Sequence, residues 1–171
     1  MRSSYIGVAR RRGAQRADIE AIYRDRFRAF VISATVLLRD GESALDVVQE
    51  GFARALRRRR SFRGDGSLEA WIWRIVLNLV RDRQRSAVRN RATSTDVLQA
   101  GSSTPPSPDD SVRARLRALP ERQRMAVFLR YYAGLTYGEI AEVLEVRPGT
   151  VGASLHAAHQ TLRRQLEEVA R

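Results

Sequence analysis

Apolar residues recur at helical spacing over most of the first half of the chain. Between residues 17 and 38 the repeating apolar positions are Ile19, Ile22, Tyr23, Phe27, Phe30, Val31, Ala34, Leu37 and Leu38. Steps of three and four residues place such side chains on one face of an α-helix. The pattern stops at Asp40 and Gly41, so we predict a first amphipathic helix that ends there.

The same spacing predicts a second helix, which Ser43 can cap. Its inward positions are Leu45, Val48, Phe52, Ala55 and Leu56. Gly51 should weaken this helix by about 1 kcal/mol relative to alanine, because glycine loses more backbone freedom on folding.

A third helix follows the loop SFRGDG, with Ser67 as its cap. Its inward positions are Leu68, Trp71, Ile72, Ile75, Val76 and Leu79. Trp71 is therefore expected in the core, whereas Trp73 lies off this stripe and is a candidate surface contact. The chain shows no alternating strand pattern, so we predict an all-α fold.

The segment from residue 119 to 166 has the pattern of a helix-turn-helix. Thr136 and Glu139 have the spacing of a capping box, in which each side chain satisfies a backbone donor at a helix start. Pro148 suits the first position of a second helix because it has no N–H to leave unpaired. Inward positions of the two helices are Ile140, Val143, Leu144, Val151, Leu155, Leu162 and Leu166.

The net charge of +12 points to a polyanionic partner. All 31 basic residues are arginine, and 21 of them precede residue 92. The acidic, Ser- and Pro-rich stretch ATSTDVLQAGSSTPPSPDD separates two basic segments and is typical of a linker. We therefore expect a basic flexible tail at 1–16, a helical domain at 17–91, a flexible linker at 92–111 and the helix-turn-helix domain at 112–171.

Composition argues against several classes of site. The chain has no cysteine, and its two histidines, His156 and His159, have no carboxylate at ligand spacing, so no metal is expected. We find no catalytic set and no cofactor motif, and therefore do not expect an enzyme. No apolar run approaches the roughly 20 residues that a membrane span needs, which favours a cytoplasmic protein without membrane insertion.

Two blocks of sequence together resemble a known family. They are DVVQEGFARAL with FRGDGSLEAWIWRIVLNLVRDRQR, and LPERQRMAVFLRYYAGLTYGEIAEVLEVRPGTV. In this order they resemble the extracytoplasmic-function group of bacterial RNA polymerase sigma factors. The resemblance implies a three- to four-helix region 2 bundle, a linker and a helix-turn-helix region 4. It implies a promoter-specificity subunit that binds core polymerase and promoter DNA, and it also implies an anti-sigma factor as partner.

The resemblance assigns surfaces to partners. The β′ clamp helices of polymerase would dock on Asp46, Gln49, Glu50 and Arg54. The melted minus-ten strand would place a flipped base in a pocket formed by Ser61, Phe62, Arg63, Gly64 and Asp65. The rest of that strand would lie along Trp73, Asn78, Arg81 and Arg85. Exposed bases stack on aromatic rings and arginine neutralises phosphate, so this chemistry suits a single strand.

Region 4 would read the minus-thirty-five duplex and contact the β flap. The candidate DNA residues are Arg147, Thr150, Gly152, Ala153, Ser154, His156, Ala157 and Arg163. The outward positions of the recognition helix carry no arginine, although arginine is the usual reader of guanine. We hypothesise that recognition depends on phosphate contacts, thymine methyl groups and DNA shape, so arginine at Ala153 and Ala157 should raise duplex affinity.

Three other classes of protein remain to be separated from this interpretation. A stand-alone helix-turn-helix regulator would need a ligand cavity or a self-complementary surface in its first domain. A nuclease would need a carboxylate cluster, and a membrane- or RNA-binding protein would not need both sequence blocks. Binding to core polymerase separates the sigma-factor hypothesis from all three.

Overall fold

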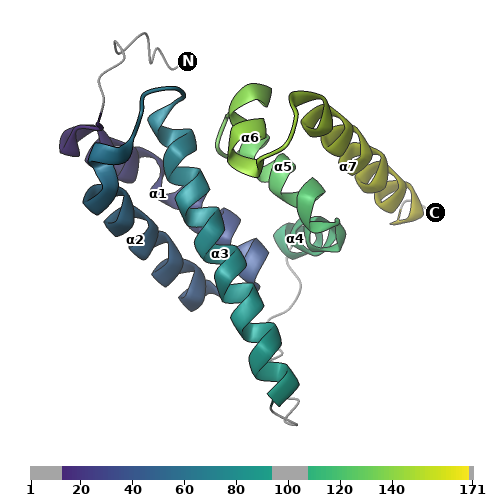
Figure 1. Ribbon diagram of the computed structural model, residues 1–171. Coiled ribbons are helices and arrows are strands. Elements are labelled where there is room, and N and C mark those ends of the chain that lie inside the picture. Colours follow the sequence, from purple (N-terminus) through teal and green to yellow (C-terminus); the bar gives the residue numbers. More distant parts are fainter. Residues whose placement is uncertain (1–12, 94–107, 170–171) are drawn as a thin grey trace.

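The computed structural model describes residues 13–93 and 108–169, and every regular element in them is helical. The first part contains α1 (Arg16–Leu38), α2 (Gly41–Arg58), the short 3-10 helix η1 (Arg59–Ser61) and α3 (Leu68–Thr93). The second contains α4 (Pro108–Ala118), α5 (Glu121–Tyr131), α6 (Tyr137–Leu144) and α7 (Pro148–Val169) (Figure 1). The all-α prediction is confirmed for these residues.

Short polar side chains fix the helix starts, mostly as the sequence predicted. Ser67 accepts the Ala70 N–H at 3.1 Å, and Thr136 and Glu139 form the complete capping box. The cap of α2 was assigned to the wrong residue. Asp40, not Ser43, accepts from the backbone N–H groups of Glu42 and Ser43, both at 3.1 Å. Asp40 has the extended backbone of a cap residue, whereas Ser43 already lies within the helix.

Aromatic rings form the centre of the first unit, α1–α3. Phe30 stacks on Trp73 with ring centroids 3.7 Å apart, and Phe52 meets Phe30 edge-on at 5.0 Å. Helix α2 approaches α3 closely at Gly51, where an added Cβ would lie 2.5 Å from a methyl carbon of Val76. This glycine therefore permits the packing of two helices, a role that the sequence pattern did not reveal.

Several expected orientations in the first unit were wrong, including that of Tyr23, which is 38% exposed. Leu45 is 39% exposed, because Ala44, Val47 and Val48 fill the buried face of α2. Trp73 is 1% exposed and in the core, while Trp71 is only partly buried. The buried positions of α3 are Ala70, Ile72, Trp73, Val76, Leu77 and Val80, so its most buried face is rotated from the expected stripe.

The second unit, α4–α7, also buries apolar side chains between its helices. Phe128, Ile140, Val143, Val151 and Leu155 are all at most 2% exposed. Helix α6 ends at Glu145, whose left-handed backbone (φ 56°) turns the chain toward Pro148 at the start of α7. The predicted helix-turn-helix is thus present in α6 and α7, although Leu166, which was expected to face inward, is 55% exposed.

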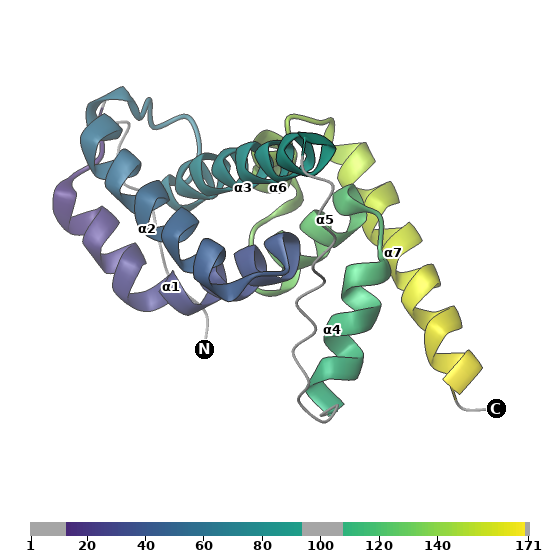
Figure 2. The same cartoon turned by 90° about the horizontal axis from the view of Figure 1, so that it is seen from below.

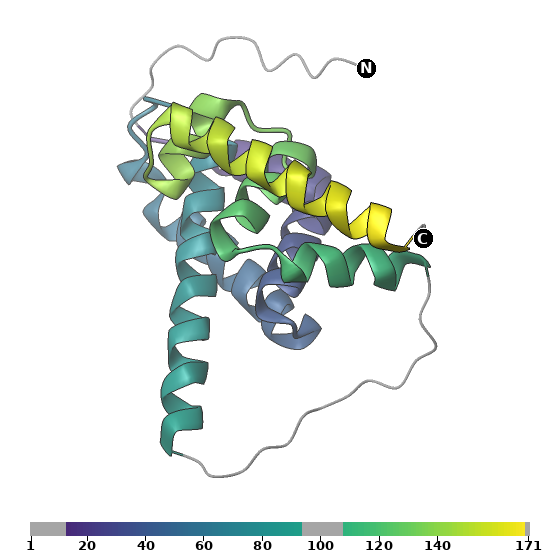
Figure 3. The same cartoon turned by 90° about the vertical axis from the view of Figure 1, so that its right-hand side faces the viewer.

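The two units pack against each other along α3. Helices α1 and α2 flank one side of α3, and α6 approaches another (Figures 1 and 2). The Arg26 side chain of α1 pairs with Glu69 at 3.0 Å and also donates to the backbone oxygens of Tyr132 and Ala133 beyond α5. The C-terminal half of α3 projects beyond the rest of the described chain (Figure 3).

The expected tail and linker boundaries differ from the observed helix limits. Gly13 and Ala14 already donate backbone hydrogen bonds to Phe62 and Arg59 at 2.8 Å, although they belong to the expected tail. Helix α4 begins at Pro108, inside the segment expected as linker. The remainder of both segments, 1–12 and 94–107, lies outside the described residues.

Candidate nucleic-acid and protein interfaces

A polar pocket with an aromatic wall lies where η1 leads into α3. Its volume is about 600 Å³. Its lining from the first unit is Ser61, Phe62, Arg63, Asp65, Gly66, Ser67, Ala70, Trp71 and Arg74. Four of the five expected pocket residues are in this lining. The fifth, Gly64, has a φ of 76° and instead turns the loop that carries them.

The loop around this pocket is held by local hydrogen bonds. Ser61 Oγ donates to the Arg58 carbonyl at 2.8 Å, and the Phe62 carbonyl accepts from Gly13. The Phe62 ring lies 5.6 Å from the Trp71 ring. The pocket therefore combines two rings with guanidinium, hydroxyl and carboxylate groups, the set that a planar polar ligand requires.

The tryptophan assignments were reversed. Trp73 was a candidate DNA contact, yet it is stacked on Phe30 and its indole Nε1 donates to Glu69 at 3.4 Å. Trp71 lines the pocket. The adjacent Arg74, also in the pocket lining, is exposed and was not among the predicted residues, although it lies in the same sequence block.

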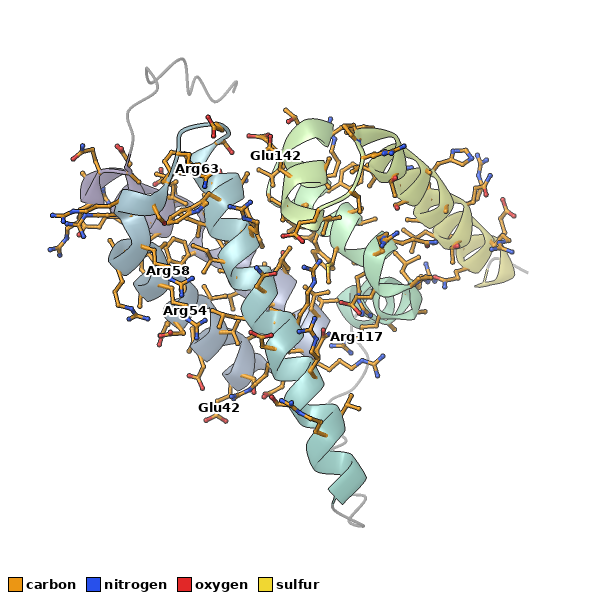
Figure 4. The ribbon with its side chains drawn as sticks, in the orientation of Figure 1. Glu42, Arg54, Arg58, Arg63, Arg117 and Glu142 are labelled. Carbon is orange, nitrogen blue, oxygen red and sulfur yellow. The ribbon has the colours of Figure 1, made fainter. Side chains whose placement is uncertain are left out.

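One side of this pocket comes from the second unit. Glu142 and Val143 of α6 complete the lining, and Glu142 Oε2 would lie 2.6 Å from a Cβ added at Gly66. Figure 4 shows Glu142 on the side of α6 that faces the loop carrying Arg63. This contact was not predictable from the sequence, because the two segments are far apart along the chain.

A second carboxylate of α6 also meets the first unit. Partial burial alone would raise the pKa of Glu139, but hydrogen bonds from Ser67 and Thr136 outweigh it and hold the pKa below its ordinary value. Glu139 Oε2 accepts from the Thr136 N–H and hydroxyl, both at 2.8 Å. The capping box therefore also contributes to the contact between the units.

The three polar residues expected along the melted strand differ in their surroundings. Asn78 is exposed and accepts from Arg81 at 3.3 Å. Arg81 is partly buried and its guanidinium lies 3.9 Å from the Met125 sulfur of α5. Arg85 is exposed, with Asp82 at 3.5 Å. In this arrangement the Arg81 side chain thus contacts the second unit.

The polar face of α2 presents the four expected polymerase-binding residues on one surface. Asp46 and Gln49 are exposed, and Glu50 pairs with Arg54 at 2.7 Å and with Arg57 at 2.9 Å. The hydrogen bond from Arg54 is the main reason why the pKa of Glu50 is lowered. An apolar groove lies beside this face and is lined by Ile19, Glu20, Tyr23, Arg24, Gln49, Phe52, Ala53 and Leu56.

The expected duplex-reading residues run from Arg147, just before α7, through the first half of that helix, with Arg163 further along it. Arg147, Ala153, His156 and Arg163 are exposed, and Thr150, Gly152, Ser154 and Ala157 are half-buried. Several of their polar groups have partners within the protein. Ser154 donates to the Thr150 carbonyl at 2.8 Å, and His156 is 2.9 Å from Gln160. This face of α7 therefore carries little charge, and some of its polar groups already have partners within the protein.

Three residues beside α7 were missed at the sequence level. Tyr131 and Tyr137 are 59% and 46% exposed, which is unusual for large rings, and Arg130, which directly precedes Tyr131, is also exposed. The signal was available in LRYYAGLTYGE, where a basic residue and several tyrosines precede the helix-turn-helix. The apolar stripe explained neither the exposed rings nor the arginine.

Residues 13–93 and 108–169 hold no group of three or more histidine, aspartate or glutamate side chains arranged for a metal ion. No helix in these ranges has both the length and the apolar character to cross a membrane.

Comparison with protein families matches both units. The model for sigma-70 region 2 matches residues 22–90, and that for sigma-70 region 4 matches residues 109–162. The ECF sigma-E factor of Escherichia coli is 31% identical over 143 residues, covering 74% of this chain and 75% of the relative. The sigma-H factor of Pseudomonas aeruginosa is 30% identical over 151 residues, with 78% of each chain covered.

Solved structures share the fold. The sigma factor RpoE of Bartonella quintana, solved with the anti-sigma factor NepR, matches with a TM-score of 0.76 and 22% identity. The match covers 88% of this chain and 97% of that chain. CnrH, solved with the cytosolic domain of CnrY, gives a TM-score of 0.68 at 23% identity, with 91% of both chains covered.

Proposed function

Because this chain belongs to the extracytoplasmic-function group of RNA polymerase sigma factors, we propose which of its surfaces meet polymerase and which meet the promoter. A sigma factor binds core polymerase, directs promoter recognition and assists melting to initiate transcription. One observation supports our assignment most strongly. The same chain carries a polar pocket with aromatic walls in its region 2 loop and a helix-turn-helix in region 4.

The pocket beside Trp71 binds one flipped base of the melted minus-ten strand. Phe62 and Trp71 supply stacking surfaces, and Ser61, Arg63 and Asp65 supply donors and acceptors for the base edge. Stacking is worth about 1 to 3 kcal/mol per base, so capture of the strand can drive melting without ATP. Asn78, Arg81 and Arg85 continue along the same helix toward the rest of the strand.

The polar face of α2 binds the β′ clamp helices of core polymerase. Asp46, Gln49 and the paired Glu50 and Arg54 offer acceptors and a cation, and the neighbouring groove at Tyr23 and Phe52 offers apolar area. A polar rim beside an apolar centre is the usual composition of a protein interface.

Region 4 binds the minus-thirty-five duplex through the face of α7 and docks on the β flap. Arg147, Thr150 and Arg163 contact the backbone, while Gly152, Ala153, Ser154, His156 and Ala157 lie against the groove. With so little charge on this face, phosphate contacts and DNA shape contribute more than guanine readout.

The packed arrangement must open before both boxes are bound. The minus-ten and minus-thirty-five boxes lie about 25 base pairs apart on the promoter, which is roughly 85 Å at 3.4 Å per base pair. In the structure the minus-ten pocket is instead walled by Glu142 of the duplex-reading unit. The 14 residues 94–107 span up to roughly 50 Å when fully extended, and the two units add their own widths. The contacts between the units include polar ones, from Arg26 to the carbonyls of Tyr132 and Ala133, and water can replace such contacts when the units separate.

An anti-sigma factor is the expected regulator, as for the sigma factor RpoE of Bartonella quintana, which shares this fold and was solved with the anti-sigma factor NepR. Such a partner would cover the polymerase-binding face of α2 or hold the two units together. The protein acts in the cytoplasm as a dissociable subunit and contributes no catalytic centre.

Reconstitution with core RNA polymerase tests this function. The purified chain should co-elute with core polymerase and direct runoff transcripts from specific genomic promoters. A double variant, Asp46→Ala with Gln49→Ala, should lose co-elution, whereas Arg28→Ala on the exposed side of α1 serves as the control. A chain that never binds core polymerase would instead be a stand-alone regulator.

A further inference from the structure

Four charged side chains line the pocket between the two units without pairing with one another. They are Arg63, Asp65 and Arg74 of the first unit and Glu142 of α6. Among the described residues none of the four forms a side-chain hydrogen bond or an ion pair, whereas Glu50 of α2 pairs with two arginines. The pocket therefore holds two cations and two carboxylates whose hydrogen-bonding groups are open to a ligand.

The Glu142 carboxylate belongs to this pocket only while the units are packed together. Its Oε2 atom would lie 2.6 Å from a Cβ added at Gly66, so the missing side chain of the glycine leaves the space that this carboxylate occupies. A ligand that binds Glu142 and the loop of the first unit at the same time must therefore bind the packed form in preference to an open one.

The aromatic wall of the pocket favours a planar ligand. The centroids of the Phe62 and Trp71 rings are 5.6 Å apart and the rings are inclined by 55°, so a base stacks on this pair and does not fit between its members. Both rings are half-buried, which leaves a face accessible. The pocket volume of about 600 Å³ lies within the range of small-molecule sites, roughly 300 to 1,000 Å³.

We propose that this pocket binds a free guanine nucleotide in the packed form, and that the nucleotide holds the two units together. The base stacks on Trp71, and its N1–H and amino group donate to the carboxylate of Glu142. The phosphate accepts from Arg63 and Arg74. Guanine presents two adjacent donors to a carboxylate, whereas adenine presents one amino group beside an acceptor nitrogen, so the site favours guanine.

The bound nucleotide would keep the chain from polymerase. It occupies the pocket that we assign to the minus-ten base, and it stabilises an arrangement that must open on the promoter. This regulatory role rests on the proposed function, whereas the binding of the nucleotide to the free chain does not.

Calorimetric titration of the full chain with guanosine diphosphate (GDP) tests the site. Adenosine diphosphate (ADP) should bind about ten-fold more weakly than GDP, because it lacks the paired donors. Guanosine, which has no phosphate, should also bind more weakly. Glu142→Gln should remove the preference for GDP over ADP, and Arg74→Gln should remove the preference for GDP over guanosine.

Glu145→Gln is the matched control, since Glu145 is an exposed acid at the end of α6 outside the pocket lining. It should bind all three ligands as the native chain does. No binding of GDP at about 1 mM would overturn the proposal. Equal affinity for GDP and ADP would overturn it too, as would a preference for GDP that survives in Glu142→Gln.

Competition with core polymerase tests the regulatory role. Saturating GDP should weaken binding of the native chain to core polymerase and leave binding of Glu142→Gln unchanged. An equal effect on both proteins would mean that GDP acts on polymerase, and would overturn this role. A native chain that binds GDP but never binds polymerase would count against the proposed function and leave the nucleotide site standing.

Discussion

For Gly51, helix propensity and the packing in the structure predict opposite effects of replacement by alanine on stability. Helix propensity alone says that Gly51→Ala should stabilise α2 by about 1 kcal/mol. In the structure the new Cβ would lie 2.5 Å from a methyl carbon of Val76, a buried residue whose branched side chain has one preferred rotamer in a helix. Relief of that clash requires the two helices to move apart.

We therefore expect Gly51→Ala to lower the free energy of unfolding by about 1 to 2 kcal/mol, because overpacking outweighs propensity. Urea unfolding followed by circular dichroism measures this change. Gly41→Ala is the matched control, since nothing lies within 4 Å of a Cβ there. A stabilising Gly51→Ala would mean that the helices adjust without cost.

Trp71 carries the second prediction at this scale. Replacement by alanine removes one of the two rings of the minus-ten pocket, so affinity for the single-stranded minus-ten DNA should fall by the worth of one stacked base, about 1 to 3 kcal/mol. Fluorescence anisotropy with the polymerase holoenzyme and a labelled strand measures it. Val88→Ala, an exposed apolar site on the same helix, should bind normally. If Trp71→Ala binds the strand as tightly as the native protein, the Trp71 ring does not contact the minus-ten base.

At the scale of elements, apolar spacing and caps predicted which segments are helical. Thr136, Glu139 and Ser67 act as the sequence indicated. The rotation of α3 was not predictable in this way, because its apolar residues cover so much of the circumference that two stripes fit almost equally well. Packing decides between the two stripes, since Phe30 of α1 stacks on Trp73, while Trp71 contacts Phe62 of the loop.

The candidate site was predictable to a similar extent. The loop that carries Ser61 to Asp65 was located through its resemblance to a family. The wall formed by Glu142 and the position of Arg130 over the Tyr137 ring were not, because both depend on contacts between helices that no local pattern encodes.

The capping box of α6 gives a prediction about pH. The pKa of Glu139 is lowered in the folded protein, so its ionised form stabilises the fold above the ordinary glutamate pKa of 4.5. This contribution is lost as the pH falls from that value through the lowered pKa. Between pH 6 and pH 3, Glu139→Gln should lose less stability than the native protein.

Unfolding free energies over that range, measured in urea, check the expectation. Thr136→Val removes the hydroxyl that donates to Glu139 at 2.8 Å and should flatten the profile in the same direction. Parallel profiles for the native protein and Glu139→Gln would show that the carboxylate contributes no pH dependence.

For the whole molecule, α3 is the structural link between the two functional units. On one side it shares the aromatic core of the first unit, and on the other it meets α5 and α6 through Arg81 and the loop pocket. The carboxylate of Glu142 occupies one side of a pocket that we assign to DNA. The packed form and the promoter-bound form therefore exclude each other.

A change of charge at Glu142 should shift the balance between these forms. Glu142→Arg places a third guanidinium beside Arg63 and Arg74, so repulsion should separate the two units in the free protein.

The distance between the units can be followed by energy transfer between two labels. The chain has no cysteine, so Arg60→Cys and Glu121→Cys allow specific labelling, one site in each unit. Energy transfer between the labels should decrease in Glu142→Arg, and in the native chain when it binds polymerase and promoter. Glu145→Arg makes the same charge change outside the pocket lining and should leave energy transfer at its native value. If transfer stays high in the promoter complex, the two units do not need to separate.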